Sequence, residues 1–600
     1  MFILGISCFY HDSAAALLKD GKIIAASEEE RFTRIKHDNS FPQNAIEFCL
    51  QKAGITAKEL DAVIFYEKPL IKFERILYNT IATFPKSFLW FMKAMPQWIE
   101  KKLWFGHLVK KHIGYTGKVY YGDHHTSHVA SSFYSSNFQE CAYLTADGVG
   151  EWTTTSIGVI KNGQIQVLKE LHYPHSLGLL YSTFTAFLGF EVNNGEYKVM
   201  GLASYGKPKY KDIIYKHLID VAADGSMKLN MEYFGFHHSF LSYNQKFIGL
   251  FGETPPPEKE FTEKAADIAA SIQKVTEEII LKQVNHLWTL APSENLCLAG
   301  GVALNCVANA EILKHTNYKN LYIQPAAGDA GCAVGAAYFL WNQFQVEKFE
   351  SEKKPYTYHP QDPWIHAYYG SDGSDYKGQD IKEFLEKESI KFKHYGDEKD
   401  LIETVAQLVS ENKVVGWFQG RQEFGPRALG HRSIIGNPAC RDMQEILNVK
   451  IKHREKFRPF APSVAQESTR KYFELGTNDS PFMLLIAPVK AELRDKLPAI
   501  THVDGSARLQ TVTPESEPLY HALIKKVGEK TGFDIIVNTS FNIRGEPIVR
   551  TPQEAFQCFA STDMDVLVLG NFVIFKEDLD PEKIIKVDPK KIHEKGITLI

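Results

Sequence analysis

The stretch that decides the fold is residues 121–151, YGDHHTSHVASSFYSSNFQECAYLTADGVGE. His124 and His128 are four residues apart, so in a helix both imidazoles project from one face, as metal ligands on a helix do. A buried strand expected over 142–145 leads to Asp147, whose carboxylate can complete the pair. Two histidines and one carboxylate leave coordination positions open, which is typical of a catalytic metal site. Because the chain has 22 histidines, this spacing alone is more often due to chance than to metal binding.

Length and composition describe an ordinary globular protein. With 600 residues the chain is too long for one hydrophobic core, so about two or three domains are expected. A hydrophobic content of 44% and a charged content of 23% are typical of soluble proteins, and the net charge of -4 gives no general attraction to nucleic acid or membrane. The eight cysteines form no CxxC pair, which argues against a disulfide framework and a cysteine zinc site.

The sequence has no sign of export or of a membrane span. Its N-terminus, MFILGISCFYHDS, lacks the basic start and long apolar run of a signal peptide. The most apolar segment, 81–104, is interrupted by four residues that prevent it from spanning a bilayer: Lys86, Lys93, Pro96 and Glu100. We therefore expect a cytoplasmic protein that has no membrane partner.

A meander of short strands occurs twice in the first part of the chain. The first copy has strands over 2–7, 14–18 and 23–26, with a Lys-Asp-Gly-Lys turn before the third. The second copy has strands over 142–145, 155–160 and 165–170, with a Lys-Asn-Gly-Gln turn in the same place. Each copy carries an aspartate in its first loop, Asp12 and then Asp147. This order predicts a duplicated fold.

Two further parts of the first domain have alternative interpretations. The aromatic-rich insert over 70–112 is either a helical hairpin packed on the core or a lid over substrate. A strand at 296–299 leads into Gly300 and Gly301 and then a helix over 302–313, which suits either anion binding by bare amides or a simple tight turn.

A second strand and helix follow at once. The strand is expected over 320–323 and the helix over 330–341, with Asp329 at the helix start. There Asp329 is either an N-cap, as its position alone favours, or a ligand.

Two arginine-rich segments mark the second domain. They are 419–433, QGRQEFGPRALGHRS, and 450–459, KIKHREKFRP. A solvated surface does not require arginines beside Gly and Pro in fixed turns, and nucleic-acid binding normally brings interleaved aromatic residues. Phosphate binding by guanidinium forks fits best, and the segment 538–542, NTSFN, could add hydroxyl and amide groups.

Ordered motifs along nearly the whole chain resemble those of the NodU/CmcH family of ATP-dependent O-carbamoyltransferases. They are YHDSAAAL (10–17), EERFTRIKHD (29–38), HHTSH (124–128), ADGVGE (146–151), GEYKVMGLASYG (195–206), LAGGVALN (298–305), GDAGCAVGAA (328–337), FQGRQEFGPRALGHRS (418–433), KFRPFAPSV (456–464), HVDGSAR (502–508) and VNTSFN (537–542). The resemblance implies an α/β fold with an N-terminal ASKHA-like domain of two RNase H-like halves and a C-terminal YrdC-like α/β domain. We place the first domain at 1–350, a linker at 351–378 and the second domain at 379–600.

The resemblance also implies a reaction in two steps. In the C-terminal domain, carbamoyl phosphate and ATP, with Mg as its counterion, form carbamoyladenylate. In the N-terminal domain the carbamoyl group passes to a hydroxyl of a small natural-product acceptor, beside iron or another divalent transition metal.

By matching motifs, each group of site residues is carried over to this chain. The implied metal ligands are His124, His128, Asp147 and Asp329. The residues implied to act on the acceptor are His11, Asp12, Lys36 and Asp147. Those implied to hold ATP and the carbamoyl group are Gly300, Gly301, Arg427, Lys450, Arg454, Arg458, Arg508, Asn538 and Ser540. Arg421 and Arg432 lie close enough in sequence to exchange roles with Arg427.

Two rival functions remain at this stage. A threonylcarbamoyl-type tRNA-modifying enzyme would share both folds, but it needs a basic RNA-binding surface that the net charge of -4 does not indicate. A nucleotide-binding scaffold would not require both residue sets to be intact. We therefore expect a small hydroxylated acceptor as the partner, no nucleic acid, and a homodimer as an allowed assembly.

Overall fold

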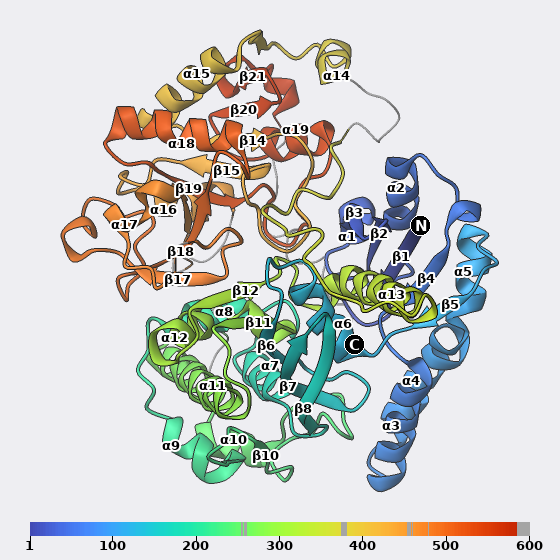
Figure 1. Cartoon of the computed structure of the whole chain (residues 1–600). Coiled ribbons are helices and arrows are strands. Elements are labelled where there is room, and N and C mark those ends of the chain that lie inside the picture. The colour runs from blue at the N-terminus through green and yellow to red at the C-terminus, as the bar shows by residue number, and fades with distance from the viewer. Residues whose placement is uncertain are drawn as a thin grey trace. The chain divides into compact units, whose positions relative to one another are not determined.

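The computed structural model describes residues 1–253, 256, 261–373, 381–452, 458, 460–477 and 479–584 (Figure 1). The chain folds into two compact units. The first consists of Met1–Glu29 and His37–Trp364, and the second begins at Ile365 and also includes Glu30–Lys36. Among the described residues, no helix combines the length and the apolar character needed to cross a bilayer.

The first unit contains two five-stranded sheets with the same connectivity. The first sheet has the order β3-β2-β1-β4-β5, from the strands β1 (Phe2–Ser7), β2 (Ala14–Lys19), β3 (Lys22–Glu28), β4 (Ala62–Phe65) and β5 (Val119–Tyr121). The second has the order β12-β11-β6-β7-β8, from β6 (Cys141–Ala146), β7 (Thr153–Lys161), β8 (Gln164–His172), β11 (Asn295–Ala299) and β12 (Asn320–Ile323).

In each sheet three antiparallel strands are followed by two strands that add in parallel on the other side of the first strand. The parallel pairs are β1 with β4 and β4 with β5 in one sheet, and β6 with β11 and β11 with β12 in the other. This repeated pattern confirms the predicted duplication and its two RNase H-like halves. The α/β class is confirmed as well.

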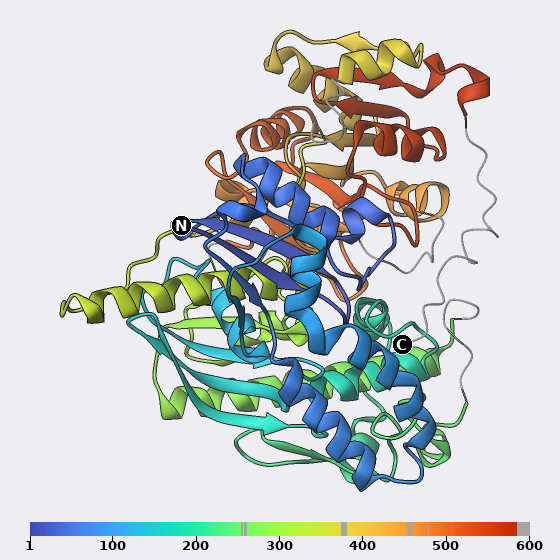
Figure 2. The ribbon, with the colours of Figure 1, turned by 90° about the vertical axis from the view of Figure 1, so that its right-hand side faces the viewer.

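Two helices bring the halves of this unit together. They are α6 (His124–Phe133) and α13 (Asp329–Ser351), which pack on each other along their length. In Figure 2 the helix α13 crosses beneath the blue strands of the first sheet. A Cβ at Gly335 would lie 1.9 Å from the carbonyl oxygen of Ser127, so only glycine allows this close approach of α13 to α6.

Helical boundaries follow local capping. The helix expected over 302–313 is divided into a 3-10 turn, Gly301–Leu304, and the helix α12 (Cys306–His315). Asn305 separates them because its side chain accepts a hydrogen bond from the amide of Ala308, and asparagine prefers this N-cap position to a helix interior.

The insert is a helical hairpin, one of the two alternatives that the sequence left open. It consists of α3 (Pro69–Ala82) and α4 (Phe88–Glu100), followed by α5 (Phe105–Ile113). Its inner faces meet around Ile76, Met95 and Trp98. The other helices of at least seven residues in this unit are α2 (Gln43–Ala53), α7 (Leu177–Phe187), α8 (Glu196–Ala203), α10 (Gln245–Phe251) and α11 (Glu263–Leu290).

The second unit is built on one mixed sheet of nine strands, in the order β13-β21-β20-β14-β15-β19-β16-β18-β17. The strands are β13 (Lys393–His394), β14 (Val415–Phe418), β15 (Arg432–Gly436), β16 (Ala461–Ala465), β17 (Leu485–Pro488), β18 (Ser506–Val512), β19 (Ile535–Ser540), β20 (Val566–Leu569) and β21 (Phe572–Phe575). Helices cover both faces, namely α15 (Glu398–Ser410) with α18 (Pro518–Thr531) on one, and α14 (Ile381–Lys387) with α19 (Pro552–Ala560) on the other. Side chains along the strands therefore alternate between two cores.

The segment Glu30–Lys36 belongs to the second unit although it follows the third strand of the chain. Arg34 donates hydrogen bonds to the carbonyl oxygens of Ile548 (2.7 Å) and Pro547 (2.8 Å) and pairs with Glu554 at 3.2 Å. No local pattern in residues 30–36 indicates this placement.

The close approach at Gly335 leads to a stability prediction. Gly335→Ala must push α6 away from α13, so we expect the free energy of unfolding to fall by about 1–3 kcal/mol. Gly249 in α10 is a matched control, because a Cβ there would meet no atom within 4 Å. Gly249→Ala should raise stability by up to about 1 kcal/mol. Thermal unfolding midpoints check both variants, and equal midpoints would contradict the role of Gly335.

Candidate active site

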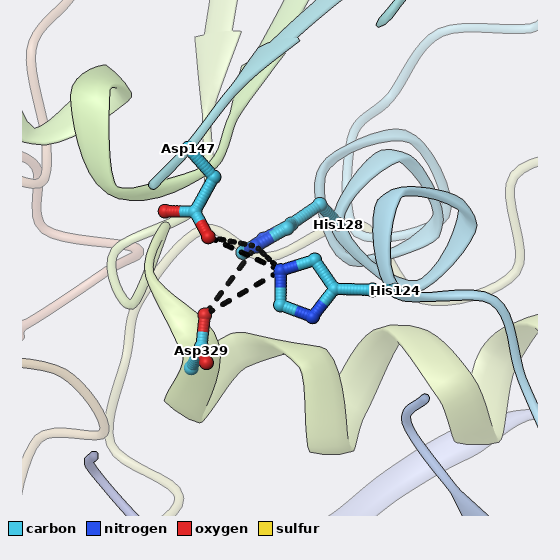
Figure 3. A group of neighbouring side chains, drawn as sticks. All are labelled: His124, His128, Asp147 and Asp329. Carbon is cyan, nitrogen blue, oxygen red and sulfur yellow. Dashed lines mark hydrogen bonds and ion pairs between the residues drawn. The ribbon is translucent and has the colours of Figure 1, made fainter. Parts of the chain in front are cut away.

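Four side chains from three elements converge in the first unit (Figure 3). His124 and His128 lie in the first two turns of α6, Asp147 follows β6, and Asp329 is the first residue of α13. One nitrogen or oxygen atom from each lies within 4.8 Å of the others, and all four residues are buried. The Nε2 atom of His124 is 3.2 Å from Nε2 of His128 and 3.1 Å from Oδ2 of Asp147, while Nε2 of His128 is 3.5 Å from Oδ1 of Asp329.

This donor set fits a divalent transition metal ion. Both carboxylate oxygens of Asp329 are buried without a hydrogen-bond partner, which is costly for a carboxylate unless a cation is close to it. Two imidazole nitrogens and two carboxylates are ligands that borderline ions such as Fe, Mn and Zn accept. Asp329 is not the N-cap of α13, since that position is held by Gly328.

Electrostatic coupling holds these four groups together. Burial by itself lowers the pKa of His128, but Cys332, Asp147 and Asp329 outweigh it and raise that pKa well above its usual value. Burial likewise opposes ionisation of Asp147, yet hydrogen bonds with His124 and His128 hold the pKa of Asp147 well below its usual value. Positive charge is therefore favoured at this point, whether protons or a cation supply it.

The double-glycine loop orients one of the four residues. The amide of Gly301 donates to Oδ1 of Asp147 at 2.9 Å, and the amide of Gly300 donates to the carbonyl of Ala327. Gly300 has a φ of 91°, and a Cβ there would lie 2.2 Å from the carbonyl oxygen of Ala146. Both amides are thus bonded within the protein, and the loop fixes the position of Asp147.

The sequence did not single out the groups around His124. Glu67 is fully buried, with Oε2 2.5 Å from Nζ of Lys72 and 3.9 Å from Nδ1 of His124. Glu151 accepts a hydrogen bond from the backbone amide of His124. Carboxylates in such positions orient metal-ligating imidazoles. The sequence signal for Glu67 was its position, two residues after the buried strand β4.

Asp12 lies between two histidines near the start of the first unit. Its carboxylate is 2.6 Å from Nδ1 of His37 and 3.1 Å from Nδ1 of His11, and His37 also contacts Asn194 at 3.0 Å. Burial lowers the pKa of His11, but Asp329 and Asp12 outweigh it and raise that pKa to about 9. His37 belongs to the EERFTRIKHD motif, but the motif alone assigns it no role. Lys36 is half-buried and belongs to the second unit.

Two of the three neighbouring arginines in the second unit are bonded to backbone. Arg421 donates to the carbonyls of Tyr369 and Gly370. Arg432 is fully buried, donates to carbonyls including that of Gly420, and lies 3.6 Å above the ring of Phe418. These contacts give Arg421 and Arg432 a structural role in the loop that follows β14.

Other predicted residues lie on the central strands of the second unit. Arg508 is on β18, and its buried Nε atom has no hydrogen-bond partner. Asn538 is on β19, and its side-chain amide donates to Ser463 while its buried Oδ1 has no hydrogen-bond partner. Both β18 and β19 are paired with β16. Arg458 is buried as well.

Lys452 is a cation that the sequence analysis did not select. It is 2% exposed, and its Nζ donates to Oγ of Ser540 at 3.3 Å and to Oδ1 of Asn542 at 2.8 Å. Lys452 therefore joins the arginine-rich segment to the NTSFN loop. The side chain of Lys450 and the whole of Arg454 lie outside the described residues.

Similarity to known proteins extends along nearly the whole chain. The model of the carbamoyltransferase N-terminus matches residues 2–338, and that of the carbamoyltransferase C-terminus matches residues 406–576. The uncharacterised protein sll1178 of Synechocystis is 48% identical over 605 residues, covering 96% of each chain. Nodulation protein NolNO of Sinorhizobium fredii is 34% identical over 96% of this chain and 80% of its own. The activator of 2-hydroxyisocaproyl-CoA dehydratase from Clostridium difficile is 14% identical over 58% of this chain and 98% of its own, with a TM-score of 0.30.

The four-residue cluster leads to a prediction about metal content. We expect one divalent transition metal per chain in the parent protein and none in His128→Ala, because the variant loses one of four ligands. His125→Ala is the matched control, since His125 is buried on the same helix but bonds Thr145 at 2.7 Å instead. Elemental analysis after dialysis measures the metal. Full occupancy in His128→Ala would show that the cluster does not hold it.

Proposed function

The chain belongs to the NodU/CmcH family of carbamoyltransferases, and we propose that it uses carbamoyl phosphate and ATP to carbamoylate a hydroxyl of a small-molecule acceptor. Carbamoyl transfer follows from the family. The order of the steps and the acceptor class are the proposal. The main support for this proposal is the chemical difference between the two units. The first has four side chains that could hold a metal ion, and the second has buried cationic and amide donors.

The first step is assigned to the second unit, the YrdC-like domain. Water hydrolyses carbamoyl phosphate to carbamate and inorganic phosphate. An oxygen of carbamate then attacks the α-phosphate of Mg-bound ATP and releases pyrophosphate, which leaves carbamoyladenylate. The transition state carries several negative charges on phosphate oxygens, so fixed cations in a dry site stabilise it. Arg427, Arg458 and Arg508 supply those charges, and Lys452 positions Ser540 and Asn542. Ser540 and Asn538 supply hydrogen bonds to the same ligands.

The second step is assigned to the first unit, where the acceptor hydroxyl attacks the carbamoyl carbon of carbamoyladenylate and AMP leaves. A divalent ion, iron or a similar metal, held by His124, His128, Asp147 and Asp329 would supply Lewis acidity at a carbonyl oxygen. The amide of Gly301 keeps Asp147 in its orientation, and Glu151 fixes the backbone of His124. Asp12 is held by His11 and His37, and His11 or Asp12 would take the proton of the acceptor hydroxyl.

The division of labour can be tested with one variant in each unit. Arg508→Ala removes a cation from the activating site, which costs about 3 kcal/mol, or roughly a hundredfold in rate. We expect it to lose pyrophosphate release and product formation together. Asp329→Ala should still release pyrophosphate from ATP and carbamoyl phosphate but carbamoylate no acceptor.

Synthetic carbamoyladenylate separates the steps further. It should restore product formation by Arg508→Ala and leave Asp329→Ala inactive. Arg470→Ala serves as a control in the same unit, because Arg470 is an exposed residue of a short surface helix and should retain both activities. If Asp329→Ala loses pyrophosphate release as completely as Arg508→Ala does, the assignment of the two steps to two units is wrong.

The assignment of acceptor residues gives a separate prediction. His11→Ala and Lys36→Ala should reduce acceptor turnover while acceptor-independent pyrophosphate release stays at the parent level. The reason for His11 is its contact with Asp12, and for Lys36 its place in the family motif. Pyrophosphate release and mass-spectrometric detection of the carbamoylated acceptor are measured side by side. Parallel loss of both signals would contradict the assignment.

A further inference from the structure

The outer face of the helical hairpin is unusually apolar. Of 23 large hydrophobic side chains that are exposed in the described part of the chain, ten fall within residues 70–104. They are Leu70, Ile71, Tyr78, Ile81, Phe84, Phe88, Leu89, Met92, Ile99 and Trp104. Soluble proteins scatter exposed hydrophobic residues singly, so a concentration of this kind marks an interaction surface. We call this set the hairpin face.

The hairpin does not need this face for its own stability. Its inner faces already pack around Ile76, Met95 and Trp98, with Phe73 and Phe91 beside them. A surface helix pair normally turns polar residues outward once its inner face is buried. Here the outward residues at successive turns of α4, including Phe88, Met92 and Ile99, are apolar as well, and they are 51%, 56% and 54% exposed. The hairpin face is therefore left for another occupant.

Charge identifies the occupant. Residues 70–112 contain eight Lys and Arg against two Glu, in a chain whose net charge is -4. Five of these cations are exposed, namely Lys86, Lys93, Lys101, Lys110 and Lys111. A second copy of the chain seated symmetrically on this face would bring like charges together. An anionic bilayer complements both the apolar side chains and the lysines.

The tip of the hairpin continues the same surface. Phe240 and Leu241 are 48% and 63% exposed, and Nζ of Lys93 lies 4.8 Å from the ring of Phe240. Asn79 of α3 donates to the carbonyl of His237, which joins the hairpin to this segment. A cavity of about 740 Å³ lies beside the tip, bordered by Phe84, Lys86, His237, His238 and Lys246, among others.

We propose that the hairpin face binds the interface of an anionic phospholipid bilayer, with α3 and α4 lying on the membrane. The helices do not span it, because Lys86, Lys93 and Pro96 interrupt the apolar run and no described helix is long and apolar enough. The absence of a spanning segment and the net charge argue against a helix that crosses the bilayer, but not against a helix pair that lies at its interface. The proposal is independent of the metal and of the reaction.

Vesicle co-sedimentation of the full chain tests the proposal. The parent protein should pellet with vesicles of phosphatidylcholine and phosphatidylglycerol, and much less with phosphatidylcholine alone. Leu89→Glu combined with Met92→Glu should weaken binding at least about tenfold, because two buried apolar contacts are lost. Lys86→Glu combined with Lys101→Glu should weaken it by a similar factor and remove most of its salt dependence.

A matched control distinguishes binding by the hairpin face from nonspecific binding of exposed apolar surface. Val167 and Leu168 on β8 are 50% and 41% exposed, so Val167→Glu combined with Leu168→Glu removes comparable apolar surface elsewhere. This control should bind vesicles like the parent. Thermal unfolding midpoints near the parent value show that each variant is folded.

Three outcomes would overturn the proposal. The first is failure of the parent to pellet with the anionic vesicles, and the second is equal loss of binding in the β8 control. The third is self-association of the parent without vesicles, measured by sedimentation velocity, that Leu89→Glu with Met92→Glu abolishes. That third result would assign the hairpin face to a second copy of the chain.

Discussion

Burial of four ionisable side chains at one point is the constraint on which the first unit depends. His124, His128, Asp147 and Asp329 come from two helices and a strand end, and each would be costly to bury alone. Together, the histidines and the carboxylates offset one another's cost of burial. Both carboxylate oxygens of Asp329 are nevertheless buried without hydrogen bonds. Removing one member leaves the others buried with unmatched charge, which is more damaging than removing a hydrophobic side chain.

This constraint explains several features that otherwise look separate. Gly335 permits α6 to approach α13 closely enough for the histidines to meet Asp329. Gly300 adopts a positive φ, and the next amide then reaches the carboxylate of Asp147. The duplicated sheets supply equivalent platforms, so that the loop after each first strand carries an aspartate, Asp12 in one half and Asp147 in the other. Both of these aspartates contact histidines.

The sequence predicted much of this arrangement because its signals are local. Strand alternation, the Lys-Asp/Asn-Gly turns and the HxxxH spacing act over a few residues, and they gave the meanders and the helix of His124 and His128. Contacts between distant segments leave no such signal. Glu67 and His37 became visible only when folding placed them beside His124 and Asp12. Likewise, nothing near Arg34 indicates that its partners are Pro547, Ile548 and Glu554.

The arginines of the second unit are another case in which contacts between distant segments could not be predicted from the sequence. Residue type and turn position made Arg421, Arg427 and Arg432 equivalent in the sequence. In the fold, the guanidinium groups of Arg421 and Arg432 donate to backbone carbonyls, and these contacts with distant segments have no local signal in the sequence. In α3 one helix serves two purposes at once. It buries Lys72 against Glu67, beside His124, and exposes Leu70 and Tyr78.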